Sequence, residues 1–131
     1  MFESQIAALL AQTWTSRLLV FAYHRIVPKP DSMLQGEVTA AAFDSQTGWL
    51  ARHATVLTLP DAIERWRRGK LPRRAACITF DDGYLSNFET ALPILQRWQV
   101  PATFFIATGF LDGGRMWNDT IIEATRRTSV A

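Results

Sequence analysis

Two adjacent carboxylates, Asp81 and Asp82, follow the apolar run 75–80 and precede Gly83. An apolar run of this length that stops at acids and a glycine predicts a buried strand with the acids at its C-terminal end. Neighbouring strand residues point to opposite faces, so Asp81 and Asp82 should differ in role, one binding a metal and the other transferring a proton. Asp-Asp-Gly is also favourable turn chemistry and by itself predicts only a turn.

A histidine stands at a comparable place, because His24 directly follows the apolar run 18–23. A lone histidine is most often structural, but at a strand end it could share a cleft with the two aspartates and bind substrate or orient a carboxylate. Tyr84 is a further candidate residue of that cleft or of a substrate site. His53 precedes the short run 55–59 and is interpreted as structural, at the opposite end of that strand.

The elements that must position these residues alternate along the chain, which predicts a parallel α/β architecture. The first, third and fourth predicted strands should be parallel neighbours whose C-terminal ends face one cleft. Strands are predicted at 18–23, 55–59, 75–80 and 102–106. Two helices should begin near Thr39 and Pro60, and a third should run from about Thr90 to the residue before Val100. A last helix is predicted over 119–127, with Asn118 as its N-cap.

The bulk composition fits one modest domain, since 131 residues with 48% hydrophobic content can bury a core. The net charge of +2, from 14 basic and 12 acidic residues, argues against a nucleic-acid partner. The single cysteine, Cys77, excludes an internal disulfide and is expected to pack as a small hydrophobe.

The N-terminal segment 1–17 is predicted to hold an amphipathic helix, because apolar residues between Ser4 and Trp14 recur at helical spacing. The domain proper would then span 18–131. Glu3 stands where a signal peptide needs basic residues, and no run approaches the roughly 20 apolar residues of a transmembrane helix. A cytoplasmic protein without a transmembrane segment is therefore expected.

The string Thr79-Phe80-Asp81-Asp82-Gly83-Tyr84 resembles the signature of the polysaccharide deacetylases, the NodB-homology domain of carbohydrate esterase family four. The segments 21–25 and 100–106 are similar to the first-strand and third-strand motifs of that family, in the same order, and 116–118 is similar to a segment after the third strand. The resemblance implies a distorted parallel (β/α) barrel, of which this chain holds about the first three strands.

The resemblance also implies an activity, the metal-dependent removal of acetyl groups from N-acetylated sugars. Asp81 would be the general base and Asp82 one ligand of a divalent metal, expected to be zinc, while the family's other two ligands come from a later His-x-x-x-His motif. This chain has only His24 and His53, 29 positions apart, and neither fits that motif. A catalytic zinc takes three protein ligands, so the chain alone is expected to be inactive.

Other functions remain open at this stage. A glycosidase would need two carboxyl groups about 5 to 9 Å apart across the scissile bond, which sequence neighbours provide poorly. A non-catalytic carbohydrate-binding or interaction module on the deacetylase fold is the main alternative, and a structural fragment is a further one. An incomplete barrel also exposes a strand edge, which predicts self-association.

Overall fold

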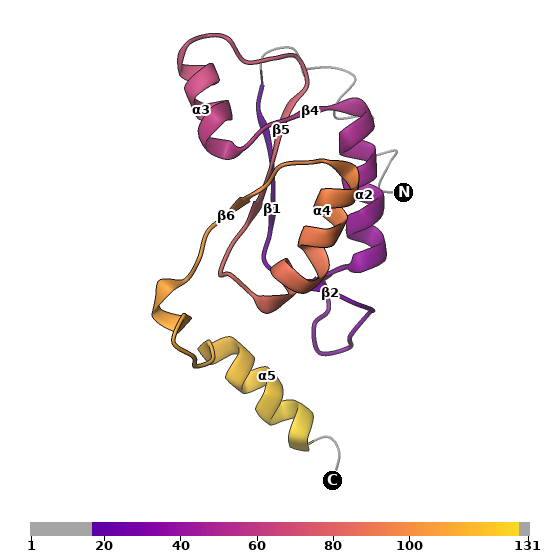
Figure 1. Ribbon diagram of the computed structural model, residues 1–131. Helices are drawn as coiled ribbons and strands as arrows, with labels where there is room; N and C mark the ends of the chain where they lie inside the picture. Colours follow the sequence, from indigo (N-terminus) through magenta and orange to yellow (C-terminus); the bar gives the residue numbers. More distant parts are fainter. Residues whose placement is uncertain (1–16, 129–131) are drawn as a thin grey trace.

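The computed structural model describes residues 17–128, which form an open parallel sheet with helices packed on it (Figure 1). The central strand is β5 (Ala75–Phe80), and β1 (Leu19–Tyr23) pairs with it in parallel along its length. The short strands β4 (Thr55–Val56) and β6 (Thr103–Phe104) pair in parallel with the beginning and the end of β5. The predicted parallel arrangement is confirmed, and the barrel is not closed.

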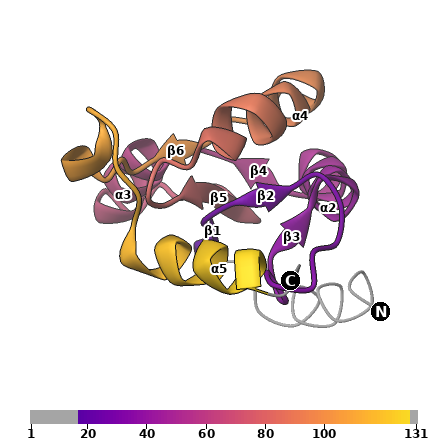
Figure 2. The ribbon, with the colours of Figure 1, turned by 90° about the horizontal axis from the view of Figure 1, so that it is seen from below.

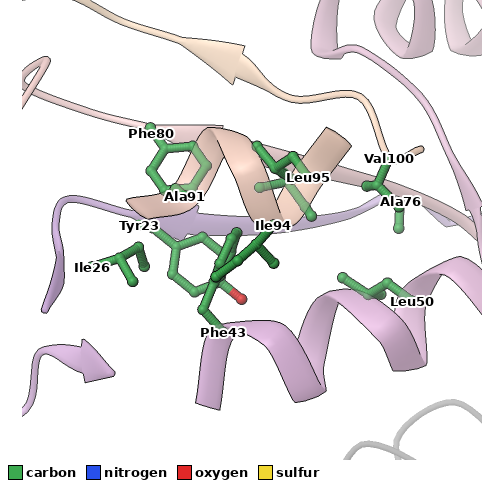
Figure 3. Packing of buried hydrophobic residues seen from close by; sticks show 11 residues of the cluster. Tyr23, Ile26, Phe43, Leu50, Ala76, Phe80, Ala91, Ile94, Leu95 and Val100 are labelled. Carbon is green, nitrogen blue, oxygen red and sulfur yellow. The ribbon is translucent and has the colours of Figure 1, made fainter. Parts of the chain in front are cut away.

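Helices α2 (Ala40–His53) and α4 (Leu92–Trp98) pack against each other over the sheet, and three aromatic rings join them to it. Phe43 of α2 has its ring centroid 5.1 Å from that of Tyr23 and 5.6 Å from that of Phe80. Figure 3 shows these rings pointing toward one another, with Leu95 of α4 nearby. This core fixes the ends of β1 and β5, where the candidate site lies.

Burial changes the chemistry of two core groups. It raises the pKa of Tyr23 to about 12, and the phenol donates a hydrogen bond to Gln46 Oε1 at 2.6 Å. Burial also raises the pKa of Cys77 to about 11, which keeps this free cysteine a neutral thiol. The prediction that Cys77 packs as a small hydrophobe is confirmed, since its side chain is fully buried.

Local capping explains where the helices begin. The Thr39 side chain accepts a hydrogen bond from the Ala42 amide, so the predicted N-cap of α2 is confirmed. Thr58 caps α3 (Leu59–Arg67) in the same way, with Pro60 in the first turn. This cap ends β4 at Val56, so the predicted strand 55–59 was too long.

Three further boundaries differ from the prediction. The strand predicted at 102–106 is only β6, because its partner β5 ends at Phe80, whose carbonyl accepts the last ladder bond from Phe105. The chain is helical from Leu85 instead of Thr90, through a π-helical turn (Asn87–Ala91) that leads into α4. The last helix, α5, is Trp117–Thr128. Asn118 therefore lies inside its first turn and is not its N-cap.

One small element was not predicted. The segment after β1 was expected to be a loop, but β2 (Ile26–Val27) pairs in parallel with β3 (Val38–Thr39). A two-residue ladder leaves no periodic pattern in a sequence, and the burial of Ile26 in the core is what places it.

The predicted helix between Ser4 and Trp14 lies outside the described residues, and the division into 1–17 and 18–131 stays a prediction. Within residues 17–128, no helix is long and apolar enough to cross a membrane.

Candidate functional site at the ends of β1 and β5

His24 and Asp81 lie at the same end of two adjacent strands. Tyr23 and Phe80, the residues before them, are register partners. The Asp81 amide donates a hydrogen bond to the Tyr23 carbonyl at 2.9 Å, which continues the ladder one step beyond the strands. The expected common edge is therefore confirmed for this pair.

Alternation along the strands sets the direction of the two residues. Tyr23 and Phe80 both point into the core that α2 covers. The residues that follow them, His24 and Asp81, therefore belong to the opposite face of the sheet. His24 is exposed and Asp81 is half-buried, so both are open to an incoming molecule.

The backbone turns sharply directly after Asp81. Asp82 and Gly83 both have φ of +70°, the left-handed region that residues other than glycine seldom adopt. A Cβ atom at Gly83 would stand 3.0 Å from Ile106 Cδ1, so the segment that follows β6 approaches this turn closely. Asp82 therefore lies within the turn itself, whereas Asp81 directly follows β5.

Tyr84 closes this loop through contacts at both ends of its side chain. The Arg25 guanidinium carbon lies 4.1 Å from the centroid of the Tyr84 ring, and the Tyr84 hydroxyl is 3.6 Å from the sulfur of Met116. Arg25 also pairs with Asp119 of α5. Neither Arg25 nor Asp119 was predicted from the sequence to be a site residue.

An apolar hollow of about 290 Å³ adjoins the loop on the side of β6. Aromatic rings from three segments line it, those of Tyr84, Phe88 and Phe104. Asp81 and Asp82 are not among its lining residues, so it lies beside the two acids and does not enclose them.

The described residues do not by themselves make up a complete metal centre. Among residues 17–128, no three His, Cys, Asp or Glu side chains gather as a metal site would require. His53 ends α2, just before β4 begins, and stacks on Trp49 with ring centroids 4.9 Å apart. It lies at the far end of the sheet, as predicted.

Comparison with known proteins identifies relatives of this region. Residues 68–127 match the family model named polysaccharide deacetylase. A poly-β-1,6-N-acetyl-D-glucosamine N-deacetylase of Staphylococcus epidermidis is 34% identical over 118 residues, which cover 80% of this chain and 41% of that relative. The protein of the same name from Staphylococcus aureus is 42% identical over 73 residues, or 55% of this chain and 25% of the relative.

Solved structures show the same likeness. A de-N-acetylase of Aggregatibacter actinomycetemcomitans superposes with a TM-score of 0.64 at 28% identity, covering 74% of this chain and 40% of its own. A Streptococcus pyogenes deacetylase superposes with a TM-score of 0.65 at 20% identity, covering 82% of this chain and 52% of its own, and supports the fold alone. This chain spans less than half the length of the curated relatives it matches.

Proposed function

We propose that this chain, whose residues 68–127 match the polysaccharide deacetylase family model, supplies two site residues for the removal of acetyl groups from an N-acetylated polysaccharide. The observation that carries the proposal is the placement of Asp81 and Asp82. They follow the central strand β5 directly, at the edge it shares with β1, and the end of a parallel strand is the usual position of a site in α/β folds. The named relatives provide the substrate class, poly-β-1,6-N-acetyl-D-glucosamine.

In this proposal Asp81 is the general base. Its carboxylate accepts a proton from a water molecule as the water oxygen attacks the acetyl carbonyl carbon. The carbon–nitrogen bond then breaks, the nitrogen takes up a proton, and acetate and a free amine leave. Asp81 suits this task because it is half-buried, on the sheet face away from the core, and open to solvent.

Asp82 is proposed as one ligand of a divalent metal, with zinc the best candidate. Asp82 is the first residue of the turn that follows Asp81, where its φ is +70°. The proposal requires two further ligands that residues 17–128 do not bring near Asp82. His24 and Tyr84 are proposed to line the substrate cleft, since they flank the same strand ends.

A chimera tests the function. In the Staphylococcus epidermidis relative, the segment that this chain matches is replaced by this chain's own sequence, and acetate release from poly-β-1,6-N-acetyl-D-glucosamine is measured. We expect release well above that of an enzyme-free control, because the grafted strands place Asp81 and Asp82 as β1 and β5 do here. A folded chimera that binds zinc but releases no acetate would contradict the proposal.

A non-catalytic carbohydrate-binding module is the second candidate. It is favoured by the hollow beside the loop, since the rings of Tyr84, Phe88 and Phe104 offer apolar faces on which a sugar ring can pack. The two candidates separate in the same experiment. A module would retain the polymer in a binding assay while releasing no acetate from it.

We further propose that the chain associates with itself through the edge of β6. Among the described residues no strand pairs with the outer edge of β6, and Phe105 and Ile106, just beyond it, are 49% and 48% exposed. An unpaired strand edge next to exposed apolar side chains is a template for association.

Sedimentation velocity of the 131-residue chain should therefore show a mass that rises with protein concentration. Phe105→Glu combined with Ile106→Lys should shift the chain toward the monomer by placing charges at the contact. Trp66→Lys is the control and should leave the distribution unchanged, since Trp66 is 62% exposed on α3 and does not line the hollow that α3 shares with Thr103 and Phe105. A compact monomer at every concentration would rule out the association.

A further inference from the structure

The side chain of Arg25 touches three separate parts of the chain. Its Nη2 atom pairs with Asp119 of α5, and its Nε atom lies 3.4 Å from Oε1 of Glu37. Its guanidinium carbon stands over the Tyr84 ring. The side chains of Arg25 and Asp119 are only 16% and 17% exposed, so solvent screens this ion pair less than a surface pair.

Arg25 stays charged in this environment. Burial lowers its pKa, but the hydrogen bond with Asp119 and the negative charge of Asp119 act in the opposite direction, and the pKa lies above its ordinary value. Two carboxylates, from Asp119 and Glu37, face this one cation. The guanidinium therefore remains a cation at any pH at which the protein is folded.

Helix α5 depends on contacts of this kind. None of its residues is fully buried, so apolar packing holds it weakly. Two arginine–aspartate pairs instead join it to the segments after β1: Arg25 with Asp119, and Arg126 with Asp31 at 2.8 Å. Figures 1 and 2 show α5 on the side of the molecule where β1 ends.

The loop between β5 and Tyr84 also needs support from outside. Asp82 and Gly83 both occupy the left-handed region, and for an aspartate that conformation costs free energy, so it persists only where surrounding contacts fix it. Arg25 against the ring and Met116 near the hydroxyl hold Tyr84, the next residue along. Both contacts connect the loop to α5 or its start.

We propose that Arg25 is a positioning residue, which joins α5 to Tyr84 and thereby fixes the turn that carries Asp81 and Asp82. Its importance for catalysis rests on the proposed function of those aspartates. The coupling between α5 and the turn does not depend on that function, because it arises from the contacts among Arg25, Tyr84 and Asp119.

The coupling is measured by NMR of the ¹⁵N-labelled 131-residue chain. Arg25→Gln should shift the amide resonances of Asp82 and Gly83 and speed hydrogen exchange in α5 by at least about tenfold, as expected when a charge-assisted contact that holds a helix is lost. Asp119→Asn should change the same resonances in the same direction, and the double variant should add little to either. Arg25→Lys, which keeps the charge but not the planar fork, should recover part of the wild-type spectrum.

Arg127→Gln is the control, because it removes one positive charge from an exposed position of the same helix. It should change neither the loop resonances nor the exchange rates. Should Arg25→Gln fail to fold, Asp119→Asn reports on the same pair from the other side. Faster exchange in α5 with unchanged Asp82 and Gly83 resonances would overturn the proposal, since Arg25 would then only anchor the helix. An inactive chimera would leave this result untouched, so the two proposals fail separately.

Discussion

The 131-residue chain alone should release no measurable acetate from poly-β-1,6-N-acetyl-D-glucosamine, and it should bind zinc only weakly. A catalytic zinc takes three protein ligands, and the described residues offer no such cluster around Asp82. A carboxylate alone is too weak a base to deprotonate bulk water, whose pKa is about 15.7. Calorimetric titration with zinc and an acetate assay on the same preparation measure both quantities.

The chimera is the positive control for both assays, because the remainder of the Staphylococcus epidermidis relative is then present. Tight 1:1 zinc binding by the isolated chain, or acetate release above the enzyme-free rate, would show that this chain holds a complete site. The proposal that this segment supplies Asp81 and Asp82 while the rest of the relatives' domain supplies the other zinc ligands would then be wrong.

Asp82→Ala in the chimera should abolish acetate release and lower zinc affinity by at least about 100-fold. Loss of an outer partner of a metal ligand already costs 10- to 100-fold, and Asp82 is proposed as a ligand itself. Zinc content after dialysis and acetate release from the same sample provide the measurement. Asp112→Ala, at an exposed position in the loop before α5, is the matched control and should retain both. A zinc-loaded Asp82→Ala chimera would remove Asp82 from the proposed ligand set.

The central part of the fold could be predicted from local pattern. The run 75–80 is apolar except for Thr79 and ends at two acids, so both the buried strand β5 and the position of Asp81 could be predicted from it. The cap at Thr39 and the buried positions Phe43 and Leu50 of α2 follow from helix periodicity in the same way. Such signals lie within a few residues of one another.

The contacts around Tyr84 could not be predicted, because they join residues far apart in the sequence. Arg25 and Asp119 are 94 positions apart, and nothing near either residue marks the other as its partner. The short strands β2 and β3 could not be predicted either, since a strand of two residues shows no alternation of apolar and polar residues. Nor could the positive φ at Asp82 be predicted, because aspartate adopts the left-handed region only occasionally.

Acetate release by the chimera with Asp81→Asn, measured beside its zinc content, tests the central claim most directly. The substitution keeps the shape of the side chain and removes its ability to accept the proton. We expect the rate to fall by about 10²- to 10⁴-fold, the usual contribution of a general base, while the zinc content stays that of the unsubstituted chimera. A rate within a few fold of the unsubstituted chimera would contradict the assignment of Asp81 as the base, and with it the account of this site.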